Sequence, residues 1–249
     1  MSHETRHAVK ELKSTYRLMK RSIDLMLGSV LLLLSLPVFL VAALAIRLET
    51  KGNPFFLQKR VGLGGRPFTI VKLRGMYIDS KVRFAHLYDY KRHKNLNFHF
   101  HALEDPRVTR VGAFVRRTSI DELPNFLNVV LGQMTLVGPR PEMPEMLELY
   151  GEYKASYLSV KPGVTCISKI SGRDSLSKQE SIEMDLGYLD NMTTYFDFSI
   201  LWRTLRGVLL RQDVYDGKFT VDTRTQQNHG TQLRGMTSSA QEQAQVGSV

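Results

Sequence analysis

The longest uninterrupted apolar stretch of the chain covers residues 25–46, which contain no charged side chain. As an α-helix this stretch would be about 33 Å long, enough to cross the hydrocarbon core of a bilayer. Basic residues flank both of its ends, with Lys20 and Arg21 before it and Arg47 and Lys51 after it. A helix that crosses a membrane keeps its positive flank on one side, so this charge pattern disfavours a simple crossing.

Pro37 lies within the apolar stretch and predicts a break in the helix, because proline lacks a backbone donor. We therefore expect a re-entrant helix that enters the bilayer, bends and returns, with both basic flanks on the cytosolic face. The Ser35 hydroxyl is the predicted partner for the backbone group that the proline frees. A helix that spans the membrane is the alternative. Asp24 opens the apolar stretch, and we interpret it as an anchor between the membrane helix and the soluble part.

Beyond residue 50 the pattern predicts a mainly helical domain with a short β-hairpin, which is an α+β fold. The segments 55–61 and 67–72 flank a glycine-rich turn and are typical of a hairpin. Helical periodicity covers residues 142–158, 181–191 and 198–210, and residues 167–170 predict a short strand. In the last helix Trp202 and its arginine neighbours favour a position at the membrane interface.

Three regions follow from these elements: a membrane segment at residues 1–50, a cytosolic catalytic domain at 51–221 and a disordered polar tail at 222–249. Residues 77–104 predict a surface loop. The histidines in this loop lack cysteine or acidic neighbours at metal-binding spacing, which favours a loop over a metal site.

The chain has 249 residues and a formal net charge of +10, so we expect acidic partners such as anionic lipid or nucleotide phosphate. No nucleic-acid partner is expected, because zinc-finger spacing, a basic zipper and an aromatic ribonucleoprotein signature are all missing from the sequence. The single cysteine, Cys166, excludes an intramolecular disulfide and a cysteine-rich metal site.

Candidate chemistry gathers in residues 105–141, where two adjacent carboxylates, Asp121 and Glu122, lie between arginines. Arg116 precedes the acidic pair, and Arg140 follows it between two prolines. Guanidinium groups match phosphate oxygens, and carboxylates among them stay ionised and serve as nucleophile, base or metal ligand. This pattern indicates a phosphoryl-transfer centre.

A second interpretation of the acidic pair is structural, because Ser119 and Glu122 fit the S-x-x-E capping box of a helix N-terminus. Two features disfavour a simple cap. Pro124 removes a backbone donor just past the first turn, and a cap does not require arginines on both sides of the acidic pair. From spacing alone both interpretations stand.

The stretch SIDELPNFLNVVLGQMTLVGPRPE resembles the central signature of the bacterial sugar transferases that act on polyprenyl phosphate, the monotopic phosphoglycosyl transferases. The resemblance continues, in order, over roughly residues 17–215. Its further motifs are Lys20-Arg21-x-x-Asp24, Phe56-x-Gln58-x-Arg60-x-Gly62, Phe68-x-x-x-Lys72-x-Arg74-x-Met76, Asp105-x-Arg107-Val108-Thr109-Arg110-x-Gly112, and Lys161-Pro162-Gly163-x-Thr165 to Gly172-Arg173.

The resemblance implies a monotopic enzyme at the cytosolic face of the bacterial inner membrane. Such an enzyme transfers a sugar 1-phosphate from a UDP-sugar to undecaprenyl phosphate and releases UMP, which begins exopolysaccharide, capsule, O-antigen or glycan assembly. It implies a covalent phosphosugar intermediate on Asp121, assistance from Glu122, and Mg²⁺ with Asp121 as its protein ligand. Membrane lipid is a further partner, and homodimer formation is left open.

The same resemblance marks substrate-binding candidates, which are Lys72, Arg74, Arg116, Arg140 and Arg173. Cys166, Lys169 and Gly75 stand where the family usually has Gly, Gln and Ser, which leaves the sugar and nucleotide preference open. Two other functions remain: a non-catalytic, membrane-attached scaffold that binds anions, and phosphotransfer of another nucleotide-activated group.

Overall fold

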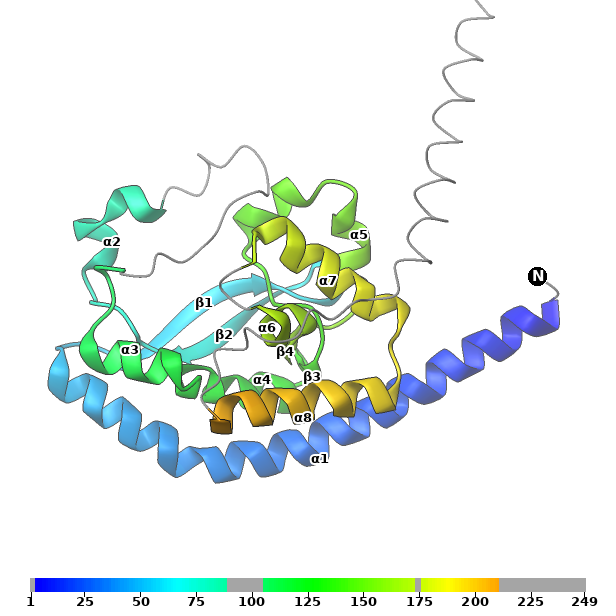
Figure 1. Ribbon diagram of the computed structural model, residues 1–249, viewed down its shortest axis with the longest axis horizontal. Coiled ribbons are helices and arrows are strands. Elements are labelled where there is room, and N and C mark those ends of the chain that lie inside the picture. The colour runs from blue at the N-terminus through cyan, green and yellow to red at the C-terminus, as the bar shows by residue number, and fades with distance from the viewer. Residues whose placement is uncertain (1–2, 89–104, 173–175, 211–249) are drawn as a thin grey trace, which may run out of the picture. The chain divides into compact units, whose positions relative to one another are not determined.

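The computed structural model describes residues 3–88, 105–172 and 176–210, and Met1–Tyr215 group into one compact unit. The fold is mainly helical with a short antiparallel hairpin, as the sequence predicted (Figure 1). The predicted tail at 222–249 lies outside the described residues. The elements are, in order, α1 (His3–Glu49), β1 (Phe55–Val61), η1 (Leu63–Gly65), β2 (Pro67–Leu73), α2 (Ser80–Arg83), η2 (Ala85–Tyr88), α3 (Arg110–Arg117), η4 (Ile120–Asn125), α4 (Phe126–Val130), β3 (Thr135–Val137), η5 (Pro144–Tyr150), α5 (Tyr153–Tyr157), β4 (Gly163–Thr165), α6 (Ile167–Ser171), α7 (Lys178–Asp190) and α8 (Thr194–Leu210).

Helix α1 is one long, bent helix that lies along the lower side of the domain beside α8 (Figure 1). Pro37 is inside it, and a proline is an established cause of a helix bend because it removes one backbone hydrogen bond. The Ser35 hydroxyl donates to the carbonyl of Leu32 at 3.0 Å and not to that of Leu33, which Pro37 leaves without its helical donor, so the predicted role of Ser35 is wrong. By length and composition, residues Ser14–Glu49 of this helix are sufficient to cross a membrane.

Three side chains near the start of the apolar stretch attach α1 to the domain. Arg21 donates to the carbonyls of Val129 and Val130 at 2.7 and 2.9 Å, at the C-terminal end of α4. The buried carboxylate of Asp24 accepts the backbone N–H of Leu136 in β3 at 2.9 Å.

Lys20 pairs with Asp197 of α8 at 2.6 Å and also donates to the Tyr188 hydroxyl at 3.2 Å. Together with the contacts of Arg21 and Asp24, this pair fixes α1 to α4, β3 and α8.

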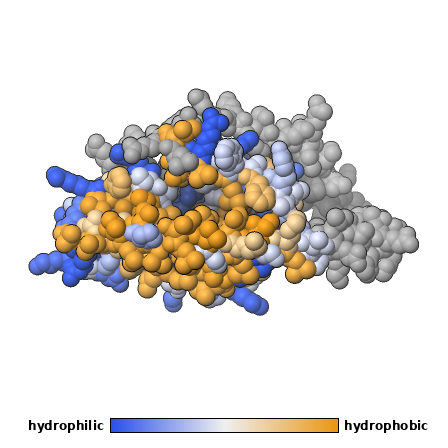
Figure 2. All heavy atoms as spheres, turned by 90° about the horizontal axis from the view of Figure 1, so that it is seen from below, coloured by the Kyte–Doolittle hydropathy of each residue, from blue (hydrophilic) through white to orange (hydrophobic). Residues whose placement is uncertain are grey.

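The opposite face of α1 is apolar and exposed. Leu33 and Val41 are each 69% exposed, and on α8 Trp202 is 66% exposed. Seen from below, Figure 2 shows that apolar side chains cover much of this side of the molecule. Large apolar side chains on such a broad surface mark a site that contacts lipid or another protein.

The hairpin β1–β2 pairs in an antiparallel register that runs from Phe55 opposite Leu73 to Val61 opposite Pro67. Its β2 strand places Ile70 in the core, together with Val129 and Met134, so the hairpin packs against α4 and the segment before β3.

Two elements differ from the sequence prediction. Residues 167–170 do not form a strand but belong to helix α6, and the strand falls instead at β4, which pairs in parallel with β3. The predicted helix at 142–158 divides into η5 and α5, because Gly151 between them has φ 51°, a left-handed conformation that glycine adopts readily.

Candidate functional site

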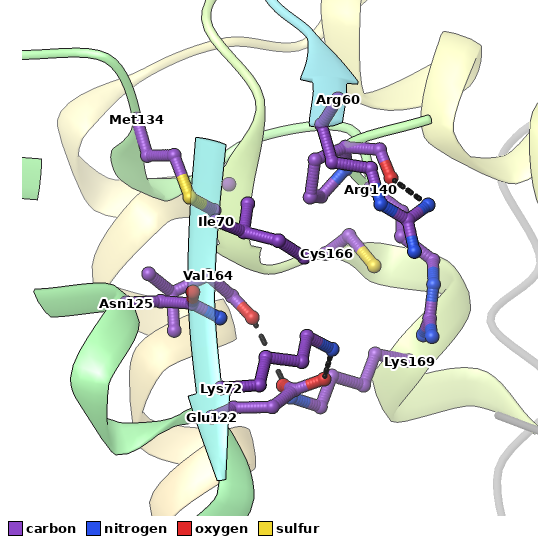
Figure 3. A pocket seen from close by; sticks show the side chains of 12 residues that line it. Arg60, Ile70, Lys72, Glu122, Asn125, Met134, Arg140, Val164, Cys166 and Lys169 are labelled. Carbon is purple, nitrogen blue, oxygen red and sulfur yellow. Dashed lines mark hydrogen bonds and ion pairs between the residues drawn. The ribbon is translucent and has the colours of Figure 1, made fainter. Parts of the chain in front are cut away.

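A pocket lies between the hairpin, η4, the loop before η5, and the β4–α6 segment (Figure 3). Four of its side chains are cationic, and Glu122 is the one carboxylate among those that line it. A cavity with this excess of positive charge suits a phosphorylated ligand. The lining residues are Arg60, Ile70, Lys72, Glu122, Asn125, Met134, Arg140, Pro141, Gly163, Val164, Cys166 and Lys169.

Glu122 joins two lysines that come from distant parts of the chain. Lys72 of β2 donates to its Oε1 at 2.9 Å, and Lys169 of α6 donates to its Oε2. Lys72 lies two residues after Ile70 on the strand, so both side chains leave the same face of the hairpin. Ile70 then fills the core while Lys72 reaches the pocket.

The charges around Glu122 determine its protonation state. Burial alone would raise the pKa of Glu122, but Lys169, Lys72 and Arg140 outweigh burial and hold it well below its usual range. Burial lowers the pKa of Lys72, Arg140 lowers it further, and the carboxylates of Glu122 and Asp121 oppose both effects. Glu122 is therefore an ionised carboxylate at neutral pH.

Asp121 precedes Glu122 in the 3₁₀-helix η4, where successive side chains leave the axis about 120° apart. The two carboxylates consequently point in different directions, and Asp121 is not among the pocket-lining residues. Its Oδ1 atom is buried, and its charge still acts on Lys72. Both carboxylates of the predicted acidic pair therefore raise the pKa of Lys72.

The structure does not form the capping box that was the alternative interpretation of this pair. Ser119 has φ 58° and ψ 16°, in the left-handed region, and its side chain makes no capping hydrogen bond. Glu122 instead directs its carboxylate to the two lysines. A non-glycine residue in this conformation costs on the order of 1–3 kcal/mol, and such strain gathers at functional sites.

Arg140 is held in place through its own backbone. Its N–H donates to Asp185 of α7 at 3.1 Å, and its carbonyl accepts the hydroxyl of Tyr157 at 2.9 Å. Arg60 of β1 donates to the carbonyl of the following Pro141 at 3.0 Å. The loop is thus bonded on several sides, and the Arg140 side chain lines the pocket.

Two other predicted substrate-binding arginines, Arg74 and Arg116, do not line the pocket. Arg74 is buried, and its guanidinium donates to the carbonyls of Thr50 and Lys51 just after α1, at 3.0 Å each. Arg116, at the end of α3, packs on Gly75, where an added Cβ would lie 2.9 Å from the Arg116 Cδ atom. Arg173 lies outside the described residues.

Among the charged and amide side chains of the pocket, three were not selected from the sequence as site residues: Arg60, Asn125 and Lys169. Lys169 had a signal, because it departs from the usual residue of the family at that position. Arg60 belongs to a quoted motif in which alternate residues share one face of a strand. Asn125 gave no signal beyond its position after Pro124.

A magnesium ion was predicted at Asp121. Within residues 14–88, 105–172 and 176–208, no group of three or more His, Cys, Asp or Glu side chains is arranged to hold a metal. Both oxygens of Glu122 are bonded by lysines, and the predicted metal ligand is the other carboxylate of the pair, Asp121. Mg²⁺ commonly takes one or two carboxylates and completes its shell with substrate phosphates and water, so this donor set fits a metal that arrives with a nucleotide diphosphate.

Residues 15–211 match the family described as bacterial sugar transferase. The chain is 38% identical over 205 residues to the UDP-glucose:undecaprenyl-phosphate glucose-1-phosphate transferase of Escherichia coli K12, covering 78% of this chain and 41% of the relative. It is 36% identical to the UDP-galactose-lipid carrier transferase of Erwinia amylovora, with coverage of 81% and 42%. It is 34% identical to the exopolysaccharide production protein ExoY of Rhizobium meliloti, with coverage of 79% and 88%. The chain thus spans less than half the length of the first two relatives.

Proposed function

Because the chain belongs to the bacterial sugar transferase family, we propose that it transfers a sugar 1-phosphate from a UDP-sugar to undecaprenyl phosphate. The products would be undecaprenyl diphosphate sugar and UMP, at the start of exopolysaccharide, capsule or related glycan assembly. The observation that carries this proposal is the cationic pocket around Glu122, on the same compact unit as a broad apolar face. A lipid phosphate and a soluble nucleotide can meet only at such a boundary.

The proposed reaction is covalent. A carboxylate oxygen of Asp121 attacks the phosphorus that carries the sugar, the bond to the bridging oxygen breaks, and UMP leaves. A phosphate oxygen of the lipid then attacks the same phosphorus and frees Asp121. Charge stabilisation and positioning supply most of the catalysis in phosphoryl transfer, and the cations of the pocket provide both.

Glu122 serves this reaction as an ionised partner of the lysines. Its low pKa and its two ion pairs support a role in holding Lys72 and Lys169 rather than in donating a proton. An incoming phosphate would compete with Glu122 for the same ammonium groups. The ammonium groups of both lysines would then bond substrate oxygens in place of Glu122 while they remain in the pocket.

We also propose Mg²⁺ as the cofactor, with Asp121 as its protein ligand and the substrate diphosphate as the other donor. When bound, the ion would neutralise charge on the diphosphate. Lys72 and Arg140 would hold the remaining phosphate oxygens.

Release of UMP tests the function directly. Purified protein in nanodiscs, given undecaprenyl phosphate and Mg²⁺, is expected to release UMP from at least one UDP-sugar of a panel. Release should stop when EDTA removes the metal. Without lipid phosphate, release should stop after the first turnover, because no acceptor resolves the covalent intermediate. A scaffold that only binds anions would release no UMP from any donor, and this result would reject the proposal.

We further propose that the membrane helix is re-entrant and that the domain faces the cytosol. The contacts of Arg21 and Asp24 attach α1 lengthwise to the domain, while its outer face is apolar. A helix bound along a soluble domain in this way enters one leaflet more readily than it crosses both.

Cysteine labelling tests this topology. Ser14 and Lys51, both exposed, lie on either side of the apolar stretch and are suited to replacement by cysteine. The native Cys166 will not interfere, because burial raises the pKa of its thiol to about 12. A membrane-impermeant maleimide should label neither Ser14→Cys nor Lys51→Cys in intact cells and should label both after lysis. Labelling of Ser14→Cys alone in intact cells would indicate a spanning helix.

A further inference from the structure

Asn125 ends η4 and is one of the side chains that line the pocket. Only 3% of it is exposed, and its Oδ1 atom has no hydrogen-bond partner in the described part of the chain. A buried amide oxygen without a partner is unfavourable, and in native proteins such an atom calls for an explanation.

The next buried asparagine gives a comparison. Asn128 donates through Nδ2 to the carbonyl of Thr69 at 2.8 Å and to Gln133 at 2.7 Å, so it ties α4 to the hairpin. The Oδ1 of Asn128 also has no partner, so the contrast lies in Nδ2: Asn125 is as deeply buried, but among the described residues no side-chain hydrogen bond joins it to another element. Folding alone therefore does not explain an amide at position 125.

The pocket has two different sides, and Asn125 belongs to the less charged one. Figure 3 shows Asn125 beside Val164, with Ile70 and Met134 above it and the paired Lys72 and Glu122 below it, while Arg60, Arg140 and Lys169 lie across the pocket. The cationic side suits phosphate groups. On the other side, the Asn125 carboxamide lies between apolar side chains and the Lys72–Glu122 ion pair, whose charges oppose each other, and this composition suits an uncharged part of a ligand that carries hydroxyl groups.

We infer that Asn125 is a specificity-determining residue, whose Oδ1 accepts a hydrogen bond from a hydroxyl of the nucleotide sugar. The hydroxyl belongs to the transferred sugar or to the ribose, and the experiment below separates these two sources. This inference rests on the proposed function. A site built to bond a hydroxyl rejects an analogue that lacks it, because the buried amide then remains unsatisfied.

The test compares Asn125→Leu, which keeps the approximate size and removes the polar atoms, with the wild-type protein. We expect the melting temperature to stay the same or to rise, because an unsatisfied buried group is removed. With the preferred donor, kcat/KM for UMP release should fall about tenfold. A merely structural asparagine would instead lower the melting temperature when replaced.

The matched control is Thr135→Val in β3. Thr135 is 2% exposed, and its hydroxyl likewise has no hydrogen-bond partner in the described residues, but it does not line the pocket. Like Asn125→Leu, Thr135→Val should have a melting temperature equal to or above that of the wild type. Unlike Asn125→Leu, it should keep the wild-type kcat/KM with every donor.

Deoxy donors identify the hydroxyl. The wild type should lose about tenfold in kcat/KM with either one sugar-deoxy donor or the 2′- or 3′-deoxyribose donor, and Asn125→Leu should treat that donor and its parent alike. If Asn125→Leu discriminates among all donors as the wild type does, the inference is wrong. Should Asn125→Leu not fold, Asn125→Ala gives the same comparison. A wild type that releases no UMP would count against the proposed function, a result distinct from an active enzyme whose selectivity ignores residue 125.

Discussion

Asp121→Asn is expected to lower the rate of UMP release by more than about 1000-fold, because an amide is not a nucleophile and the covalent step is lost. The variant should keep the wild-type melting temperature, since the substitution preserves the shape of the side chain. Intact-mass measurement without lipid acceptor should find the added sugar phosphate on the wild-type protein and not on the variant. UMP release near the wild-type rate would end the assignment of Asp121 as nucleophile.

The matched control for this prediction is Asp79→Asn. Asp79 is a half-exposed carboxylate whose ion-pair partner is Arg83, in the same short helix region. Its exposed carboxylate pairs within its own segment and not with a lysine of the pocket, so its replacement should leave both UMP release and the covalent adduct unchanged.

Lys178→Met is expected to cause the largest loss of stability, about 3–5 kcal/mol, because it breaks a buried ion pair and leaves the Glu142 carboxylate with the more distant Arg60. The Lys178 ammonium bonds Glu142, and these side chains are only 6% and 4% exposed. Tyr150 donates to the same carboxylate at 2.7 Å. The free energy of unfolding in detergent, measured with denaturant at neutral pH, gives the result, and a Lys178→Met protein as stable as the wild type would contradict it. Lys154→Met, which removes an exposed lysine from nearby α5, is the control and should change little.

The same pair predicts how stability depends on pH. Burial opposes ionisation of Glu142, but Lys178 and Arg60 outweigh burial and lower its pKa from 4.5 to about 2. Because the pKa is lower in the folded state, this contribution is fully present above about pH 4.5 and is lost as the pH falls toward 2. Lys178→Met removes the main cause of the low Glu142 pKa, so the variant should lose less stability than the wild type between about pH 4.5 and pH 2 in the same denaturation measurement.

The sequence predicted those elements whose pattern is local. The hairpin followed from alternation on either side of a glycine turn, and α7 and α8 followed from helical periodicity. Residues 167–170 resembled a strand because Ile167 and Ile170 enclose polar residues in a short segment. A distant contact decides otherwise: Asp185 accepts the N–H of Ser168 in the first turn of α6.

The sequence predicted charged residues that form the candidate site, but it did not predict which of them pair with each other. Arginines around an acidic pair indicated phosphate chemistry, and Lys72 and Arg140 indeed line one pocket with Glu122. Lys169 meets Glu122 across 47 positions of sequence, a contact that depends on how β4 and α6 pack. Periodicity carries no information about such a pairing.

The carboxylate of Asp185 has a consequence that reaches beyond α7. It accepts the backbone N–H groups of both Arg140 and Ser168, so one buried side chain sets the loop that carries a guanidinium and the helix that carries the Lys169 ammonium. The positive charges of the pocket are therefore preorganised by the protein interior. The main chain that carries these charges is in place before any ligand arrives, so a phosphate redirects the lysine side chains without moving the loop or the helix.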